Sequence, residues 1–147
     1  MTLVIGIGNA LRGDDGIGPE IARRIALARD DVKVLTPRQL LPEHAYDVGL
    51  ADLVIVVDAA VGPTPGTVTC ERVRPGVAAR LDHAISPAAL VTLVRDAFGW
   101  QPSVWTITVQ GACFDIGAPI SAAVADAVPD AVHAALALMP QPIGCTR

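Results

Sequence analysis

The sequence predicts an α/β fold, a three-layer sandwich with a mostly parallel, twisted central sheet of about five strands and helices on both faces. Apolar β-branched runs alternate with amphipathic helix-like segments, as in βαβ units. Residues 53–57 are five consecutive apolar residues, typical of a parallel strand buried on both faces. A chain of 147 residues, 52% of them hydrophobic, suits one domain with a substantial core. We expect residues 1–139 to form a single domain and residues 140–147 a flexible tail.

The first half of the chain supplies three strands and two helices. Ile17, Ile21 and Ile25 recur at helical spacing, and we expect Leu27 to pack beside them while the neighbouring arginines face solvent. Pro42 suits the first turn of a second helix. The expected elements are a strand at 3–7, a helix at about 17–29, a strand at 32–35, a helix from 42 to about 50, and a strand at 53–58.

The second half of the chain continues the alternation. Ser86 followed by Pro87 is a helix start, and Gly99 is the expected end of that helix. Another helix begins at Ser121, and Pro129 should kink it or make it restart. The expected elements are a turn at 62–66, a strand at 67–73 at the edge of the sheet, a helix at 87–98, a strand at 104–109, a loop at 110–117 and a helix from 121.

The loop after the first strand does not fit a nucleotide. Gly6 and Gly8 supply two glycines of a dinucleotide fingerprint, but Leu11 stands where the third should allow close packing of helix on strand. Asp14 and Asp15 would repel a pyrophosphate. A Walker loop is excluded because no Gly-Lys-Ser/Thr follows.

Three carboxylates are expected near one edge of the sheet. Side chains of neighbouring loop residues diverge, so we expect one of Asp14 and Asp15 to point into a site and the other to cap the helix that begins near Ile17. Asp58 ends the buried strand and should lie at the same edge, where open α/β sheets bind ligands. On this position alone, Asp58 could instead only accept hydrogen bonds from loop amides.

The run from Gly6 to Pro19, Gly-x-Gly-Asn-x-Leu-x-Gly-Asp-Asp-Gly-x-Gly-Pro, resembles the N-terminal signature of the hydrogenase maturation proteases. The resemblance extends over nearly the whole chain, and it includes Gly117, Ser121 and Val124 near the C-terminus. It implies a cytoplasmic, aspartic-type endopeptidase, a hydrolase that removes the C-terminal extension of a [NiFe] hydrogenase large-subunit precursor after nickel insertion. That precursor is the implied partner.

The resemblance also implies a metal-binding set. Val-Val-Asp-Ala at 56–59 matches the family's second metal-contacting carboxylate, and the segment 82–86 resembles its histidine loop, with Asp82 in place of the usual small hydroxyl residue. Asp15, Asp58 and His83 are then the ligands, and Asp15 and Asp58 are also catalytic. Mixed carboxylate and imidazole ligands suit nickel, zinc or cadmium. Nickel would arrive with the precursor, and cadmium or zinc would substitute in vitro.

Residues of two loops are candidates for substrate contact. Gly8, Asn9 and Asp14 belong to the opening loop. Gln39 and Glu43 belong to a Gln-Leu-x-Pro-Glu segment that replaces the Asp-Gly-Gly-Thr-like turn of many family members, so the hydrogenase that serves as substrate stays open. For Glu43, a solvated helix residue is the favoured interpretation.

Composition excludes several other classes of partner. The formal net charge is −4 without a basic cluster, which argues against nucleic acid. No apolar run reaches the roughly 18 residues of a membrane span, and the first residues enter a strand without a signal-like segment. We therefore expect a cytoplasmic protein in which Cys70, Cys113 and Cys145 are buried or incidental thiols. His44 and His133, in predicted helices, receive no functional role.

Two rival functions remain at the level of sequence. The first is a non-catalytic Rossmann-like module that binds an anion or small ligand through the Gly6–Gly18 loop. The second is a metallohydrolase with a tightly held ion of its own and a small-molecule substrate. The protease hypothesis requires Asp15, Asp58 and His83 to lie together, whereas a binding module does not.

Overall fold

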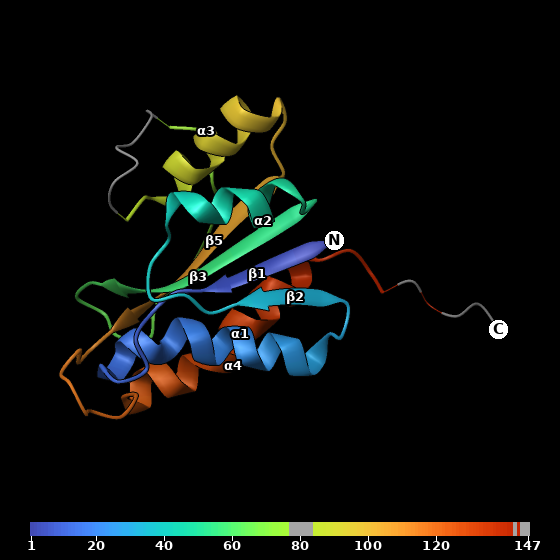
Figure 1. Ribbon diagram of the computed structural model, residues 1–147. Helices are drawn as coiled ribbons and strands as arrows, with labels where there is room; N and C mark the ends of the chain where they lie inside the picture. Colours follow the sequence, from blue (N-terminus) through green and yellow to red (C-terminus); the bar gives the residue numbers. More distant parts are fainter. Residues whose placement is uncertain (77–83, 143, 145–147) are drawn as a thin grey trace.

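Five strands form the central sheet of the computed structural model, which describes residues 1–76, 84–142 and 144. They lie in the order β2-β1-β3-β5-β4, parallel except for β4, which pairs antiparallel with β5 at one edge (Figure 1). The edge position of β4 confirms the prediction for residues 67–73. The strands are β1 (Thr2–Gly6), β2 (Val32–Leu35), β3 (Leu53–Val61), β4 (Val68–Arg72) and β5 (Ser103–Gly111).

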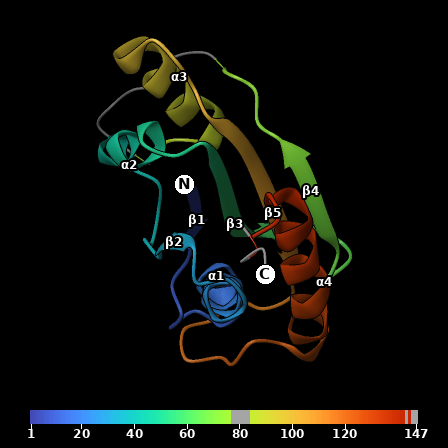
Figure 2. The same cartoon turned by 90° about the vertical axis from the view of Figure 1, so that its right-hand side faces the viewer.

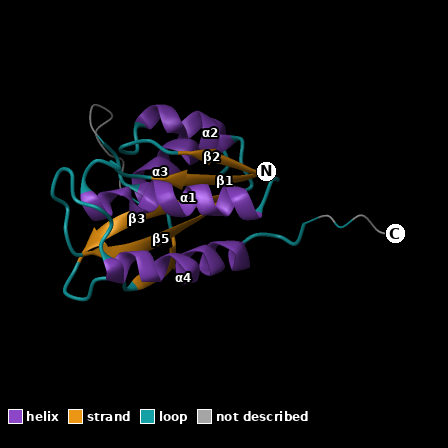
Figure 3. Cartoon of the chain, turned by 90° about the horizontal axis from the view of Figure 1, so that it is seen from below, coloured by secondary structure: helices purple, strands orange, loops and turns teal. Residues whose placement is uncertain are grey.

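Helices cover both faces of the sheet, as predicted. Figure 2 shows α1 (Ile17–Ala28) and α4 (Ala122–Leu138) on one face, and α2 (Ala45–Gly49) and α3 (Pro87–Phe98) on the other. Seen from below, α1 and α4 lie side by side (Figure 3). Short 3-10 helices precede two of them, η1 (Gly13–Gly16) before α1 and η2 (Pro42–His44) before α2. In the described part of the chain, no helix has the length and apolarity that a membrane crossing requires.

The core is divided by the sheet into two apolar clusters. Leu3 and Ile5 of β1 point toward α2 and α3, whereas Val4 between them points toward α1 and α4. All three side chains are fully buried. Strand side chains alternate between faces, so a strand with helices on both sides must be apolar throughout, which explains the unbroken apolar runs of β1 and β3.

Helix α1 follows the predicted stripe with one exception. Ile17, Ile21 and Ile25 are fully buried against the sheet, but Leu27 is 75% exposed, so its predicted burial is wrong. Two residues beyond Ile25 correspond to a rotation of about 200° around the helix, which places Leu27 on the solvent side.

Helix α3 confirms its predicted ends. The Ser86 hydroxyl oxygen accepts a hydrogen bond from the amide of Ala89 at 3.1 Å, and Pro87 occupies the first turn. Gly99 ends the helix in the left-handed conformation, with φ of +76°. The amide of Gly99 donates to the carbonyl of Arg95 at 2.9 Å. Both ends of the helix are therefore specified by local sequence.

Strand β3 is longer than predicted. We expected it to end at Asp58, but it continues to Val61 because β5 pairs with it as far as Gly111. The neighbour on its other side, β1, stops at Gly6 opposite Val57. Asp58 therefore lies inside β3, at the level where β1 has already ended.

Helix α4 continues through Pro129, so the predicted restart is wrong. Proline cannot donate the hydrogen bond that the turn before it would accept. Buried residues on both sides of Pro129, among them Val124, Val128 and Ala131, pack on the sheet in one apolar cluster. This packing holds the two halves in one helix.

The loop after β1 lies at the topological switch point of the sheet. From β1 the chain runs through α1 to β2 on one side, while β3 lies on the other side of β1. In open α/β sheets this crevice, outside the carboxyl ends of the strands, is where ligands bind. The fold thus brings the loop after β1 and residue Asp58 to the same place.

Close packing of α1 on the sheet depends on Gly18. A Cβ at Gly18 would lie 2.6 Å from the carbonyl oxygen of Val57 and would also collide with the carbonyl oxygen of Ile7. A Cβ at Gly6 would lie 2.5 Å from the carbonyl oxygen of Gly18. Gly18 therefore takes the packing role that Leu11, which is exposed, cannot fill.

We predict that Gly18→Ala destabilises the fold. The new methyl group would collide with the backbone carbonyl oxygens of Ile7 and Val57, and neither can move away without displacing the backbone. The expected loss is about 2–3 kcal/mol in the free energy of unfolding, measured by urea denaturation. Gly76→Ala is the matched control, since its nearest contact would be the Ala88 Cβ at 3.2 Å. Equal stability of the two variants would contradict the packing argument.

Candidate functional site

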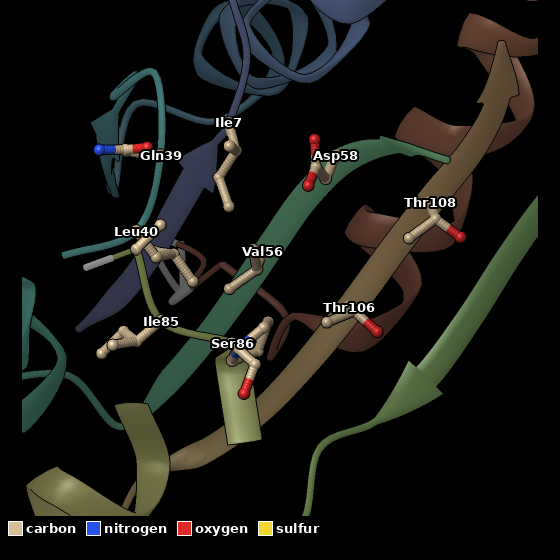
Figure 4. A pocket seen from close by; sticks show the side chains of 11 residues that line it. Ile7, Gln39, Leu40, Val56, Asp58, Ile85, Ser86, Thr106 and Thr108 are labelled. Atoms are coloured by element: carbon tan, nitrogen blue, oxygen red, sulfur yellow. The ribbon is translucent and has the colours of Figure 1, made fainter. Parts of the chain in front are cut away.

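A pocket of about 430 Å³ opens at the carboxyl end of the sheet on the α3 side (Figure 4). In Figure 4, Val56 and Asp58 of β3 lie beside Thr106 and Thr108 of β5, opposite Ile85 and Ser86 at the start of α3. The lining residues are Ile7, Gln39, Leu40, Val56, Asp58, Ala84, Ile85, Ser86, Pro87, Thr106 and Thr108.

Asp58 is the acidic residue in the wall of this pocket. Its Oδ1 accepts a hydrogen bond from the amide of Ala59 at 2.8 Å. Burial raises the pKa of Asp58 to about 6, against the lowering effect of the Ala59 amide, and the negative charge of Asp15 raises this pKa further. Asp58 is therefore poised to gain or lose a proton close to neutral pH.

Asp15 lies near enough to Asp58 to influence its ionisation, although it does not line the pocket. Its Oδ2 accepts a hydrogen bond from the amide of Asn9 at 2.7 Å. The side chain of Asn9 in turn accepts from the amide of Leu11 at 3.0 Å. Gly8, with φ of +147°, packs against the backbone of Asp15 so closely that a Cβ would collide with its carbonyl oxygen. Gly8 and Asn9 therefore position Asp15.

Asp14 has a different environment from its neighbour. It is fully buried, and its carboxylate accepts four hydrogen bonds. The donors are the amides of Ala112 (2.7 Å), Cys113 (3.0 Å) and Ser121 (2.7 Å) and the hydroxyl of Ser121 (2.8 Å). The structure therefore gives Asp14 a structural role in place of the predicted substrate contact, because a buried carboxylate with four donors is closed to a ligand.

The predicted helix cap is also wrong. The N-cap of α1 is Gly16, and it makes no side-chain hydrogen bond. The carboxylate of Asp14 bonds instead to the segment between β5 and α4, and Ser121 at the N-cap of α4 donates its hydroxyl to Asp14. Long-range donors have replaced the local amides that a cap would use.

The hydrogen bonds of Asp14 decide its charge. Burial alone would raise its pKa, but the amides of Ser121, Ala112 and Cys113 and the Ser121 hydroxyl together outweigh burial and lower the pKa below its usual value. Asp14 is therefore a buried ion that is stabilised by its donors.

The remaining predicted residues are dispersed. Gln39 is exposed at the mouth of the pocket, and Glu43 is exposed on η2 away from the lining. His83 lies outside the described residues, although Ala84, which follows it, lines the pocket. Among residues 1–76, 84–142 and 144, no three His, Cys, Asp or Glu side chains form a group that could hold a metal.

Two threonines of β5 were missed by the sequence analysis. Thr108 pairs with Asp58, and Thr106 pairs with Val56, so their side chains share the pocket face of the sheet. The alternation of residues 104–109 already places both threonines on one face. What the sequence could not supply is the neighbour relation between β5 and β3.

The two histidines and three cysteines to which the sequence analysis assigned no function lie in different surroundings. The Nδ1 atom of His44 accepts a hydrogen bond from the amide of Leu41 at 2.9 Å, and His133 is exposed on α4. Cys70 is an exposed free thiol and Cys113 a half-buried one. Cys145 lies outside the described residues.

Several solved structures with the same fold are named as hydrogenase maturation proteases. The hydrogenase maturating endopeptidase HybD from E. coli is 26% identical, with a TM-score of 0.74, over 92% of this chain and 90% of that chain. HybD from Thermococcus kodakarensis is 20% identical (TM-score 0.70; 95% and 99% covered), and HycI from Thermococcus kodakarensis KOD1 is 20% identical (TM-score 0.71; 92% and 88% covered). At 20% identity these two support the fold alone.

The structural likeness confirms the resemblance that the motifs predict. It also confirms the predicted hydrolase class, since the solved protein that is 26% identical is named as an endopeptidase. No protein-family model matches the chain, and no curated protein matches it either.

We predict that Asp14→Ala destabilises the protein by roughly 3 kcal/mol, because three buried amides and a hydroxyl lose their acceptor. Urea denaturation measures the loss. Asp126→Ala, which removes an exposed carboxylate on α4, is the control and should stay within about 0.5 kcal/mol of the parent. A stable Asp14→Ala protein would show that water replaces the carboxylate at no cost.

We predict that Asp58→Asn, unlike Asp14→Ala, stabilises the protein at neutral pH. Since the pKa of Asp58 is about 6 in the folded chain and 3.8 ordinarily, the folded state binds more protons between these values. The contribution of Asp58 to stability is thus lost as pH rises from about 4 to about 6. Asp58→Asn should raise the free energy of unfolding by roughly 1–2 kcal/mol at pH 7, with little effect at pH 3.5. An equal effect at both pH values would contradict a raised pKa.

Proposed function

We propose that the chain is an endopeptidase that removes the C-terminal extension of a [NiFe] hydrogenase large-subunit precursor after nickel insertion. The proposal depends on the fold and the placement of two carboxylates within it. The chain has the fold of a solved hydrogenase maturating endopeptidase over 92% of its length, and its two predicted catalytic carboxylates interact at the switch point of that fold. We expect this reaction to take place in the cytoplasm.

Asp58 is the better candidate for general base. It lines the pocket, and a pKa of about 6 lets it accept a proton while it stays largely ionised at pH 7. In this proposal a water molecule attacks the carbonyl carbon of the scissile peptide and transfers a proton to Asp58. The same proton then passes to the amide nitrogen as the C–N bond breaks. Burial, with a smaller contribution from the charge of Asp15, keeps the pKa of Asp58 raised and so keeps it basic enough to act.

Nickel enters this proposal as part of the substrate. Within the described residues, Oδ1 of Asp15 and Oδ2 of Asp58 make no hydrogen bond, so one oxygen of each carboxylate is open to a cation. The motif adds His83 as the nitrogen ligand. Two oxygens and one nitrogen suit nickel, and cadmium or zinc would replace it in vitro. Recognition of the bound metal would restrict cleavage to precursor that is already loaded.

Contacts with the peptide are assigned to the pocket. Gln39 at its mouth offers hydrogen-bond partners to an extended backbone. Thr106 and Thr108 turn their methyl groups toward Val56 and Asp58 and their hydroxyls away (Figure 4), and the Thr106 hydroxyl donates to the carbonyl of Glu71 at 3.5 Å. Gly8 and Asn9 act on substrate indirectly, because they hold Asp15 in place. Glu43 remains a candidate only for contacts away from the pocket.

We predict that Asp15→Asn and Asp58→Asn each reduce cleavage of nickel-loaded precursor by at least about 100-fold, since each removes a charge that the reaction uses. The mass shift of the large subunit on electrophoresis measures cleavage. Asp115→Asn, an exposed loop carboxylate, is the matched control and should cleave at the parental rate. For the parent, kcat/KM should rise with pH through about 6, since this ratio reports the ionisation of Asp58 in the free enzyme, before the nickel-loaded precursor binds.

Three outcomes would count against the proposal or a part of it. A folded Asp15→Asn, Asp58→Asn double variant with parental activity would remove both residues from the reaction. Equal cleavage of nickel-free and nickel-loaded precursor would remove the metal from recognition while leaving the protease function in place. Metal retained by the purified protein would favour the rival metallohydrolase.

A further inference from the structure

Three loops at the carboxyl edge of the sheet expose large apolar side chains. Val61, the last residue of β3, is 90% exposed, Ile116 in the loop after β5 is 84% exposed, and Leu11 in the loop after β1 is 65% exposed. Only two other large hydrophobic side chains in the described ranges are exposed as much, Leu27 and Tyr46 on the outer surfaces of α1 and α2. We call Leu11, Val61 and Ile116 the apolar rim.

The three rim residues belong to one surface. The amide of Gly117 donates to the carbonyl of Leu11 at 2.8 Å, which joins the loops that carry Leu11 and Ile116. Val61 pairs with Gly111, the residue at which the second of these loops leaves β5. Figures 1 and 3, viewed at right angles to one another, both place these loops at the same end of the molecule.

The apolar rim is continuous with the proposed active site. The amide of Leu11 bonds to the side chain of Asn9, and the amide of Asn9 bonds to Asp15. Val61 lies three residues beyond Asp58 on the same strand, so its side chain points to the α1/α4 face while that of Asp58 faces the pocket. A molecule that covers the rim therefore lies beside the loop that carries Asp15, at the end of the strand from which Asp58 enters the pocket.

A protein substrate needs more contact than the pocket can give. A specific protein–protein interface buries about 800 Å² on each partner, whereas a pocket of about 430 Å³ accommodates only a few residues of an extended peptide. Exposed apolar side chains that cluster around a site are typical of interaction surfaces. The partner that fits is a folded protein whose terminal peptide reaches the pocket.

We propose that the apolar rim is the docking surface for the folded body of the large-subunit precursor. This inference rests on the proposed function, because it takes its occupant from it. The rim binds an apolar surface of the precursor that lies near the cleaved peptide, and the pocket receives the peptide itself. Docking thus supplies affinity, and the carboxylates supply chemistry.

The test compares a rim variant with a matched surface variant. The rim variant carries Leu11→Ser, Val61→Thr and Ile116→Ser, and the control carries Leu27→Ser and Tyr46→Ser, which are equally exposed but lie on α1 and α2. Biolayer interferometry measures affinity for nickel-loaded precursor, and electrophoresis measures its cleavage. We expect the rim variant to bind about tenfold more weakly or worse, with cleavage reduced in proportion below saturation, while the control matches the parent.

Each outcome bears on one of the two proposals. If the parent cleaves the precursor and the rim variant binds it equally well, docking at the rim is wrong and the protease function stands. If the parent binds without cleaving, the proposed function fails, and loss of binding in the rim variant still supports docking. If light scattering shows a parental dimer that the rim variant dissociates, the occupant is a second copy of the chain, which overturns the proposal.

Discussion

The geometry of the site depends on one buried ion, the carboxylate of Asp14. Its four donors belong to the segment between β5 and α4, about a hundred residues further along the chain. A charge without water must be compensated by hydrogen bonds, so this segment and η1 are held together wherever the fold is intact. The reverse bond, from the amide of Asp14 to the carbonyl of Cys113 at 2.9 Å, fixes the same pair of segments. Asp15 takes its position from this clamp, because it is the next residue.

Asp14 and Asp58 show how the number of donors sets the properties of a carboxylate. Both lose solvent, and burial acts on both in the same direction. Four donors hold the pKa of Asp14 below its usual value, whereas one amide leaves the pKa of Asp58 at about 6, with the charge of Asp15 acting in the same direction as burial. Asp14 is thereby fixed as an anion with a structural role. Asp58 keeps the freedom to exchange a proton that chemistry requires.

The sequence predicted the local features of the fold better than its long-range ones. The strands and the caps of α3 follow from patterns within a few residues, and the structure has them. The role of Asp14 could not be predicted, since its donors at Ala112 and Ser121 are remote in sequence. The length of β3 and the place of Thr108 depend on the pairing of β3 with β5, which no local pattern specifies. The exposure of Leu27 could have been predicted from the sequence, because it follows from helical geometry alone.

The loop after β1 has the position of a phosphate-binding loop but not its chemistry. Such a loop binds anions because its backbone amides point at the ligand without partners. Here the amides are used within the protein, to carbonyls and side-chain oxygens that include Asp15. The paired donors are the amides of Gly8, Asn9, Leu11, Arg12, Asp14 and Asp15.

An anion that approached this loop would therefore find few free donors and the charge of Asp15. This disfavours the binding module that the Gly-x-Gly motif by itself would allow. A cation, or a peptide group beside one, meets carboxylate oxygens instead. In a nucleotide-binding protein, free amides at the switch point favour anions. Here carboxylates take their place, so the site favours cations. Gly18 keeps the close helix packing that both kinds of site require.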